Sequence, residues 1–446
     1  MKQKITIAGA GLVGSLSALY LTKRGYDVTI YEKRKDLRSE IITAGKSINL
    51  ALSTRGWTAL KKVNAHQEVE KIAIPMYKRI MHDEDGNLTE QQYGKEGQAI
   101  YSVSRAELNV IMMDLAEKNG AKIHFNEKCI DVNFETLSAA FKNSNTNNIS
   151  NIQSNAIIGA DGTYSAIRDV MINKLSHDID VKYIDHKYKE LLLPADSNGK
   201  HLLDKNALHI WPRGNFMLIA LANLDGSFTC TLFAAEKGKD SFEDLDSEKE
   251  VIEYFKKKFP DFTSMVPNLY EQWVSNPTSS LSIVRTHPWN VEDKVLLIGD
   301  AAHATVPFYG QGMNCGFEDC RILNEILEKN NDNLMLSFNE FSKIRKAEGD
   351  GVQDLSMHNF IVMRDKTADP KFLLQKKIEK KFSELYPKKW IPLYSMVSFT
   401  NISYSKAWEI GMKQESIMQE IMSTPNIEEV WESDEIMSKI NVLMYF

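Results

Sequence analysis

Cysteines are few in this chain of 446 residues, and none of them forms a C-x-x-C pair. The four are Cys129, Cys230, Cys315 and Cys320, and none has a histidine partner at the spacing that zinc sites use. The sequence therefore predicts neither a disulfide framework nor a metal site. Such sparse cysteine usage is typical of proteins of the reducing cytosol.

Long apolar runs are also lacking. No uninterrupted stretch approaches the roughly 20 residues that a membrane helix needs. A strand-like segment begins within a few residues of the N-terminus, where a signal peptide would need its apolar core. We therefore expect no transmembrane segment and no secretion signal.

Blocks of positive charge and internal repeats are absent as well. The formal net charge is −6, and a short run such as residues 256–258 is typical of a solvated helix face. Because a nucleic-acid surface needs clustered lysine and arginine, we expect no nucleic-acid partner. The length allows two or more structural units with a large core.

The chain does have a glycine-rich turn near its N-terminus. An apolar run at residues 5–8 precedes Gly9, Gly11 and Gly14, a helical pattern follows, and a second strand-like segment ends at Glu32. This order predicts a βαβ unit that binds an ADP-containing cofactor. Gly9 allows the turn, Gly11 lets backbone N–H groups approach the pyrophosphate, and Gly14 lets helix and strand pack closely. Glu32 is expected to accept from the ribose hydroxyls.

Two later segments repeat the pattern of a buried strand followed by polar residues. Residues 156–159 lead into Asp161 and Gly162, and residues 294–298 lead into Gly299 and Asp300. Pro307 and a glycine-studded turn follow, and the turn opens a helix at residues 312–314. We expect both segments to join the N-terminal unit in one cofactor site.

Between these segments the pattern is β-rich. Strand-like segments at residues 208–211, 216–222 and 228–233, with a turn at Asp225 and Gly226, predict an antiparallel sheet that forms a second layer. The Asn/Ser-rich run at residues 143–155 is interpreted as a long surface turn. Beyond about residue 334 the sequence is mostly helical in character.

The glycine turn, Asp161-Gly162 and Gly299-Asp300 with Pro307 downstream, in that order, resemble the single-component FAD-dependent aromatic hydroxylases, the group A flavoprotein monooxygenases. Segments at 101–105, 209–213, 227–233, 308–314 and 354–360 are similar to the branch that hydroxylates L-kynurenine. The similarity runs from about residue 5 to about residue 405.

The resemblance implies an α/β fold of the p-hydroxybenzoate hydroxylase-like type. It implies a Rossmann-type FAD-binding domain at residues 1–180, completed by a return segment at 286–333. It also implies a β-rich substrate domain at 181–285, with part of 70–105, and a C-terminal helical cap at 334–446.

The resemblance also assigns contacts to FAD. The expected cofactor-binding residues are Gly9, Gly11, Leu12, Val13, Gly14, Glu32, Arg34, Arg105, Asp161, Asp300, Gly312, Met313 and Asn314. Arg34 and Arg105 match positions that approach the ADP portion, and Asp300 suits the ribitol or ribose hydroxyls. The positive end of the helix that starts at Gly312 can stabilise negative charge on the reduced flavin. From the residues alone, Asp300 could equally be a helix cap and Arg105 a surface ion pair.

Substrate contacts are implied in the same way. Arg79 matches an arginine that binds the substrate carboxylate, for which a guanidinium is well suited. The other expected substrate-binding residues are Tyr93, Asn359, Tyr394, Phe308, Gln311 and Met363. Taken singly, a surface arginine is usually solvated, Tyr93 beside a glycine could be a turn residue, and Tyr394, Met363 and Phe308 would ordinarily be core.

The chemistry that the resemblance implies is centred on the flavin and not on a catalytic side chain. NADPH reduces FAD, the reduced flavin reacts with O2 to give a C4a-hydroperoxide, and this species converts L-kynurenine to 3-hydroxy-L-kynurenine. No second glycine-rich fingerprint is present, so we expect NADPH to bind transiently. His303 has no serine or aspartate at triad spacing in the sequence, which favours a structural role.

The chain departs from the family pattern at Cys315, where alanine is expected, and at Tyr309, a variable position. No membrane-anchoring tail follows the helical region, unlike the mitochondrial forms, so we expect a soluble cytoplasmic protein of bacterial type. The residues leave open whether it is a monomer or a homodimer.

Two alternatives remain open at this point. One is a group A hydroxylase of another aromatic acid or a polycyclic compound. The other is a flavin-binding interaction module without oxygenase turnover, although residues 310–314, which such a module would lack, are intact.

Overall fold

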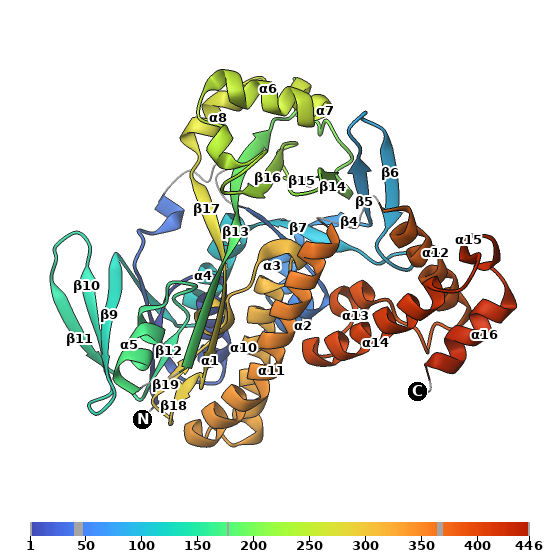
Figure 1. Cartoon of the computed structure of the whole chain (residues 1–446). Helices are drawn as coiled ribbons and strands as arrows, with labels where there is room; N and C mark the ends of the chain where they lie inside the picture. Colours follow the sequence, from blue (N-terminus) through green and yellow to red (C-terminus); the bar gives the residue numbers. More distant parts are fainter. Residues whose placement is uncertain (1, 40–47, 176–177, 364–368, 445–446) are drawn as a thin grey trace.

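The computed structural model describes residues 2–39, 48–175, 178–363 and 369–444. Two sheets form the body of the molecule, one above the other in the view of Figure 1, and a group of helices lies beside them. In that view the C-terminal helices α12 to α16 are at the right.

The lower sheet has six strands, and all of its neighbouring pairs are parallel except β18 with β19. In spatial order they are β18 (Asn290–Val291), β19 (Val295–Leu297), β12 (Ala156–Gly159), β1 (Lys4–Ala8), β2 (Asp27–Glu32) and β8 (Lys122–Phe125). The strand before the glycine turn, the strand before Asp161 and the strand before Asp300 therefore lie side by side, as the sequence predicts. Because parallel neighbours end at one edge, the three polar turns meet there.

Helix packing on this sheet depends on two of the glycines. Helix α1 (Leu12–Lys23) follows β1 directly, and it packs against α4 (Arg105–Lys118) and α10 (Gly312–Lys329). A Cβ at Gly14 would lie 2.0 Å from the carbonyl oxygen of Gly9. Gly9 itself has φ +101°, and its Cβ would lie 2.5 Å from the carbonyl oxygen of Ala160. Neither position has room for a side chain, as the glycine fingerprint requires.

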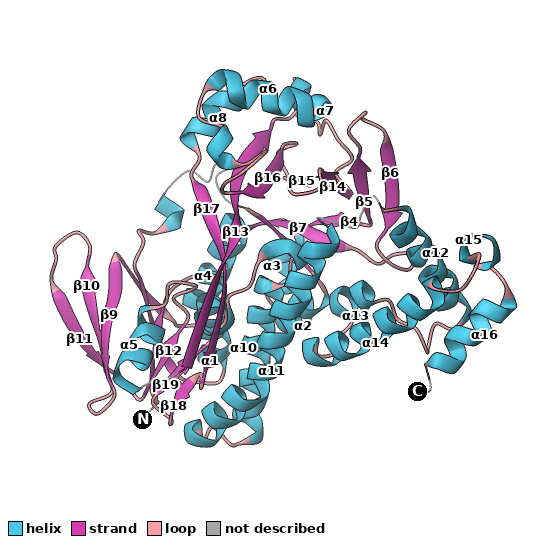
Figure 2. Ribbon diagram, in the orientation of Figure 1, coloured by secondary structure: helices cyan, strands magenta, loops and turns pink. Residues whose placement is uncertain are grey.

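The upper sheet has seven strands, and α6 to α8 cover its outer side in Figure 2. In spatial order the strands are β17 (Thr278–His287), β13 (Asp178–Leu193), β16 (Phe228–Ala235), β15 (Met217–Ala222), β14 (Ala207–Pro212), β5 (Lys78–His82) and β6 (Leu88–Gln92). The covering helices are α6 (Glu248–Lys258), α7 (Pro260–Met265) and α8 (Leu269–Ser275). The antiparallel β14–β15–β16 meander agrees with the three strands predicted from the sequence.

Smaller elements join the two sheets. They are β3 (Asn49–Leu52), β4 (Ile74–Met76) and β7 (Ile100–Ser104) in a three-stranded sheet, with α2 (Thr54–Lys62), α3 (His66–Glu70), α5 (Ala166–Leu175), α9 (Asp300–His303) and the short 3-10 turns η1 (Leu37–Ser39), η2 (Phe242–Asp244) and η3 (Pro307–Tyr309).

The Asn/Ser-rich run at residues 143–155 is not one long turn, so that prediction was wrong. Only its first part turns, and Ile149–Gln153 forms β11, which pairs with β10 (Ser138–Asn143). A third strand, β9 (Glu127–Asn133), completes this small sheet. The polar composition favoured a turn in the prediction. This exposed strand is stabilised by backbone hydrogen bonds to its neighbour and therefore needs few apolar side chains.

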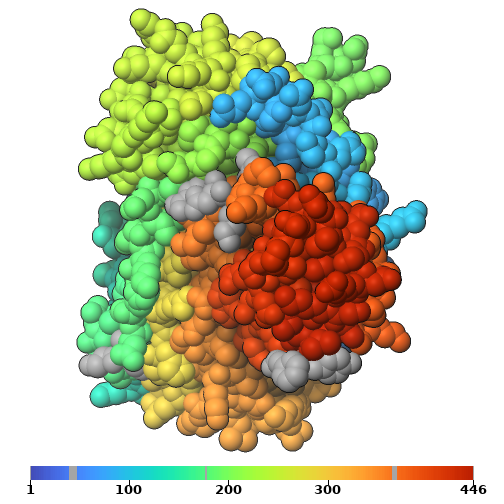
Figure 3. Space-filling view, turned by 45° about the vertical axis from the view of Figure 1, so that its right-hand side comes forward, coloured from blue at the N-terminus to red at the C-terminus, as the bar shows by residue number. Residues whose placement is uncertain are grey.

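From Leu334 onward the described chain is helical. The helices are α11 (Leu334–Ile361), α12 (Pro370–Leu385), α13 (Leu393–Phe399), α14 (Tyr404–Met422), α15 (Ile427–Val430) and α16 (Asp434–Leu443). The last of them share a small core of their own, which includes Phe382, Trp390 and Met418, and they form a red lobe at the surface in Figure 3. In the part of the chain that the structure describes, no helix is both long and apolar enough to cross a membrane.

Two buried carboxylates on α10 connect the cofactor side to the C-terminal helices. Asp319 accepts from the backbone N–H of Gly299 (2.9 Å), from His303 Nε2 (2.6 Å) and from Arg345 Nε (2.7 Å). Glu318 bonds Arg345 (2.9 Å) and Arg55 (3.1 Å). All five side chains are at most 5 % exposed.

The pairing fixes the protonation states of this cluster. Burial opposes charge on both partners, but mutual attraction outweighs it. The pKa of Asp319 falls to about 2, and the pKa of His303 rises well above its ordinary value. His303 thus has an aspartate partner that its spacing in the sequence did not reveal, because α10 brings Asp319 back beside it.

We expect Asp319→Asn to lower the free energy of unfolding by about 3–5 kcal/mol, because it leaves the His303 and Arg345 cations buried with one carboxylate fewer. Urea unfolding measures the change. The control is Asp114→Asn, which removes a partner of Arg38 that is 56 % exposed and should cost less than about 1 kcal/mol. Equal stability of the two variants would contradict the role given to Asp319.

A second buried carboxyl gives a prediction about pH. Glu190 on β13 is 7 % exposed; its carboxyl contacts the Thr231 hydroxyl (3.1 Å), and burial raises its pKa to about 8. In the unfolded chain it ionises near its ordinary value of 4.5. Its contribution to stability is therefore present at low pH and is lost as the pH rises toward the folded pKa.

Glu190→Gln removes this titration. Between about pH 5 and about pH 9, the free energy of unfolding of the unsubstituted protein should fall by about 2–4 kcal/mol relative to the variant. Urea unfolding across that range tests it, with Glu253→Gln at a side chain that is 67 % exposed as the control. Parallel pH profiles for all three proteins would show that Glu190 is ionised in the folded state.

Candidate functional site

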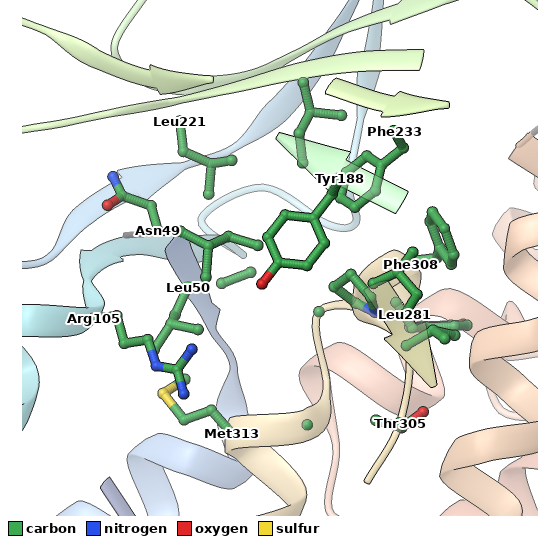
Figure 4. Close-up of a pocket in the computed structure, with 18 of the residues that line it drawn as sticks. Asn49, Leu50, Arg105, Tyr188, Leu221, Phe233, Leu281, Thr305, Phe308 and Met313 are labelled. Carbon is green, nitrogen blue, oxygen red and sulfur yellow. The ribbon is translucent and has the colours of Figure 1, made fainter. Parts of the chain in front are cut away.

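A cavity of about 690 Å³ lies between the two layers. It is lined by strands of the upper sheet and by turns and helices that follow strands of the lower sheet. Figure 4 shows part of its wall: Tyr188 and Phe233 come from the upper sheet, and Arg105 and Met313 come from helices of the lower layer. The cavity brings together residues that are up to about 380 positions apart in the sequence, since Gly11 and Tyr394 both line it.

The glycine turn forms one end of the cavity. Gly11, Leu12 and Val13 line it, and a Cβ at Gly11 would meet no atom within 4 Å. Helix α1 starts here without a side-chain cap and without an acid in its first turn. Its first N–H groups are therefore available to an anion such as a pyrophosphate.

Glu32 and Arg34 lie at the end of β2 and do not line the cavity itself. Glu32 accepts from the N–H of Ala10 (2.8 Å) and from Arg34 Nε (2.7 Å). Burial of the carboxyl opposes its ionisation, but these hydrogen bonds outweigh burial and hold its pKa below the ordinary value. Glu32 is thus a charged acceptor next to the glycine turn, as a ribose ligand requires, whereas Arg34 is 64 % exposed and already paired.

The return segment supplies another part of the cavity wall. Asp300, Gly312 and Met313 line it. The Asp300 carboxylate makes no hydrogen bond to any described residue, so the alternative of a helix cap does not hold. Helix α10 starts at Gly312 with no acid in its first turn, which leaves its positive end facing the cavity.

Arg105, the first residue of α4, also lines the cavity. In Figure 4 its guanidinium lies near Asn49, Leu50 and Met313. It forms no ion pair with a described residue, so the surface ion pair considered from the sequence is not made. A cation that makes no ion pair with a described residue at this end is suited to an anionic cofactor.

Asp161 does not line the cavity, although Ala160 and Gly162 on either side of it do, and its cofactor contact stays a prediction. One carboxylate oxygen accepts from the N–H groups of Ala166 (2.8 Å) and Ile167 (3.4 Å) at the start of α5, and burial raises its pKa. Its contact in this structure is therefore with α5.

The other end of the cavity is built around Arg79 on β5. Its guanidinium lies 5.5 Å from the ring centre of Tyr93 and 5.4 Å from that of Tyr394, and these two rings stack at 5.2 Å. Arg79 Nε is buried. Among the described residues it has no hydrogen-bond partner, and the guanidinium forms no ion pair there. Burial raises the pKa of both tyrosines, so their hydroxyls remain protonated donors.

Three further predicted residues stand beside this group. Phe308 on η3, Asn359 on α11 and Met363 just after α11 all line the cavity. Asn359 donates to the backbone oxygen of Phe308 (2.7 Å) and lies 3.2 Å from the sulfur of Met363. Asn359 therefore fixes the Phe308 turn as well as facing the cavity.

Two predicted residues direct their side chains elsewhere. Gln311 accepts from the Tyr404 hydroxyl (3.0 Å), and Asn314 bonds the backbone of Ser53 (2.9 Å) and Ala51 (2.9 Å). Both are at most 2 % exposed and neither lines the cavity. Their hydrogen bonds stabilise the part of the chain that carries Gly312 and Met313 into the cavity wall.

The apolar wall of the cavity was missed by the sequence reasoning. It is formed by Leu208, Ile210, Met217, Ile219, Leu221, Phe233 and Leu281. Alternate residues of β14 and β15 make up most of this wall, so strict alternation along each strand could have found it. Alternation along a strand does not by itself determine which face of the strand is turned toward the cofactor layer.

The cluster of His303, Cys315 and Asp319 lies outside the cavity. The three ligand-type atoms lie within 4.8 Å of one another and all three residues are buried. Arg345 already occupies this group, through Asp319 and the carbonyl oxygen of Cys315 (3.3 Å). The cluster is therefore a structural ion network.

Comparison with known proteins agrees with this site. A family model described as an FAD binding domain matches residues 2–330. A kynurenine 3-monooxygenase from Flavobacterium johnsoniae is 48% identical over 441 residues, covering 99% of this chain and 98% of the relative. Those from Christiangramia forsetii and Myxococcus xanthus are 46% and 41% identical, over 98% and 96% of this chain and 98% and 93% of theirs.

Solved structures support the fold. A 2-methyl-3-hydroxypyridine-5-carboxylic acid oxygenase superposes with a TM-score of 0.67 at 19% identity, over 83% of this chain and 94% of that one. The tetracycline destructase Tet(51) gives 0.62 at 16% identity, over 90% and 99%. The glycine turn, the return segment and the relatives agree, and the chain therefore belongs to the kynurenine 3-monooxygenase family of FAD-dependent aromatic hydroxylases and is a flavoprotein monooxygenase.

Proposed function

We propose that this protein hydroxylates L-kynurenine to 3-hydroxy-L-kynurenine with NADPH and O2. The observation that carries the proposal is Arg79, whose Nε is buried without an acceptor beside a cavity of about 690 Å³. The Arg79 side chain is partly buried, and its Nε donor is fully buried. A buried donor without an acceptor is costly, so a bound ligand is expected to supply the acceptor and the negative charge.

The surroundings of Arg79 suit the amino-acid end of such a ligand. A carboxylate can accept two hydrogen bonds from a guanidinium, and the hydroxyls of Tyr93 and Tyr394 add donors close by. The aromatic ring would then extend toward Phe308 and the apolar wall from Leu208 to Leu281. Burial of the carboxylate and the ring at opposite ends would fix which ring carbon faces the cofactor.

The cavity has little acid–base chemistry of its own. Among the described residues that line it, Asp300 is the one carboxylate, and histidine and lysine are missing. This composition favours a substrate whose ring is already activated, as the amino group of kynurenine activates its neighbouring carbon. A phenol, in contrast, would gain from a base that removes its proton.

FAD would be held by the glycine turn, Glu32, Arg105, Asp300 and the start of α10. When bound, reduced FAD would activate O2, from which one oxygen atom is transferred to the substrate. The chain's own part is to bind and orient the substrate through Arg79 and to keep water from the buried aromatic end. The open and positive end of α10 would stabilise negative charge beside it.

Two further assignments belong to this proposal. We retain the division into FAD-binding (1–180 and 286–333), substrate (181–285) and cap (334–446) regions. A cytoplasmic location is consistent with four cysteines that are all free and buried.

Replacement of Arg79 by methionine should raise the KM for kynurenine by about 30-fold to 1,000-fold, because a buried charge-assisted contact is worth about 2–4 kcal/mol. FAD content should not change. The control is Arg24→Met, which removes a surface partner of Asp332 and should leave KM unaltered. Steady-state NADPH oxidation with product detection measures both, and a normal KM for the Arg79 variant would refute the carboxylate assignment.

The substrate itself is tested by product analysis. The purified holoenzyme with NADPH and air should form 3-hydroxykynurenine from kynurenine, with little product from 4-hydroxybenzoate. Hydroxylation of 4-hydroxybenzoate in preference to kynurenine would favour the alternative, another aromatic acid, which Arg79 would also bind. Peroxide without any hydroxylated product would exclude both.

A further inference from the structure

One half of strand β13 is an open sheet edge. β17 pairs with β13 from Asp178 onward, but β16 pairs with it only from His186 to Leu193. Along residues 178–183 the side of β13 opposite β17 has no paired strand among the described residues. In Figure 2, β13 and β17 extend below the level of β14 to β16 as a two-stranded ribbon.

This open segment is exposed on both of its faces. Ile179, Val181 and Tyr183 share one face and are 37 %, 38 % and 62 % exposed. The other face carries Asp180 and Lys182, whose side chains are 54 % and 71 % exposed and whose charged ends lie 3.7 Å apart within the chain. An exposed edge strand with apolar side chains is a template for pairing with another strand.

The order of charges makes this edge complementary to itself. Suppose that two copies pair antiparallel about a two-fold axis at Val181. Asp180 then lies opposite Lys182 of the second copy, and Lys182 lies opposite Asp180 of the second copy. On the other face Ile179 meets Tyr183 of the second copy and the two Val181 side chains meet, so the cross-strand pairs from residue 179 to residue 183 are favourable. Asp178 lies outside this matched stretch, because it would face Ile184 of the second copy. A lysine by itself on an edge strand discourages pairing with another strand. Here the aspartate two positions away gives the lysine of the second copy an oppositely charged partner.

We propose that residues 178–183 are the contact through which two copies of this chain associate, by antiparallel pairing of their open β13 edges. A two-fold axis makes such a contact closed, because the same surface is used on both copies. The backbone ladder supplies the attraction, and the Asp180–Lys182 pairs set the register. The cavity lining on β13 begins only at Tyr188. Association through residues 178–183 therefore does not involve the residues that line the cavity.

Charge reversal tests the proposal on the FAD-loaded protein. Asp180→Lys places lysine opposite lysine twice in each pair of copies, and Lys182→Asp places aspartate opposite aspartate twice. Each variant alone should associate at least about tenfold more weakly than the unsubstituted protein, as measured by sedimentation equilibrium over a wide concentration range. An equimolar mixture of the two should regain association, because every lysine then faces an aspartate.

The control is Lys249→Glu on α6, at a side chain that is 82 % exposed, and it should not change association. Flavin absorbance and kynurenine turnover confirm that each variant is folded. Three results would overturn the proposal: an unsubstituted protein that stays monomeric at every concentration, single variants that dimerise normally, or a mixture that does not recover. Failure of the kynurenine assignment would leave this test unaffected, because sedimentation equilibrium measures the mass of the associated protein and not its activity.

Discussion

The carboxylate of Asp319 is the contact on which the geometry of this protein most depends. It binds the N–H of Gly299, which begins the Asp300 turn, together with His303 on α9 and Arg345 on α11. Glu318, its neighbour, reaches Arg345 and Arg55, and Arg55 in turn lies over the ring of Tyr404 on α14 (3.9 Å). The cofactor turn, the helix that faces the cavity and the C-terminal helices are thus held in one buried network.

The surroundings of Arg79 differ from those of the arginines that are paired within the protein. Arg55 and Arg345 are matched by carboxylates, and Arg213 by backbone carbonyls, whereas Arg79 has aromatic rings around it and no acceptor on its buried Nε. Charges in the Asp319 network are matched within the protein, whereas Arg79 and, at the other end of the cavity, Arg105 form no ion pair with a described residue. That contrast, more than the shape of the cavity, indicates an anionic ligand.

Much of the cofactor layer could be predicted from sequence, because it depends on local rules. The spacing of Gly9, Gly11 and Gly14 reflects backbone approach, and the structure leaves no room for a side chain at Gly9 and Gly14, as predicted. Contacts made by distant segments could not be foreseen: the Asp319 partner of His303 depends on how α10 returns, and the side chains of Gln311 and Asn314 turn to Tyr404 and Ser53. The individual substrate and cofactor contacts, and the domain boundaries, stay predictions.

The most direct measurement is an equilibrium titration of the oxidised holoenzyme, followed by the flavin absorbance spectrum. L-Kynurenine and its decarboxylated analogue, which differ only in the group assigned to Arg79, are added in turn. Our account predicts a saturable spectral change with kynurenine and binding of the analogue that is weaker by about 30-fold or more. Equal affinity for the two, or no perturbation of the flavin by kynurenine, would contradict it.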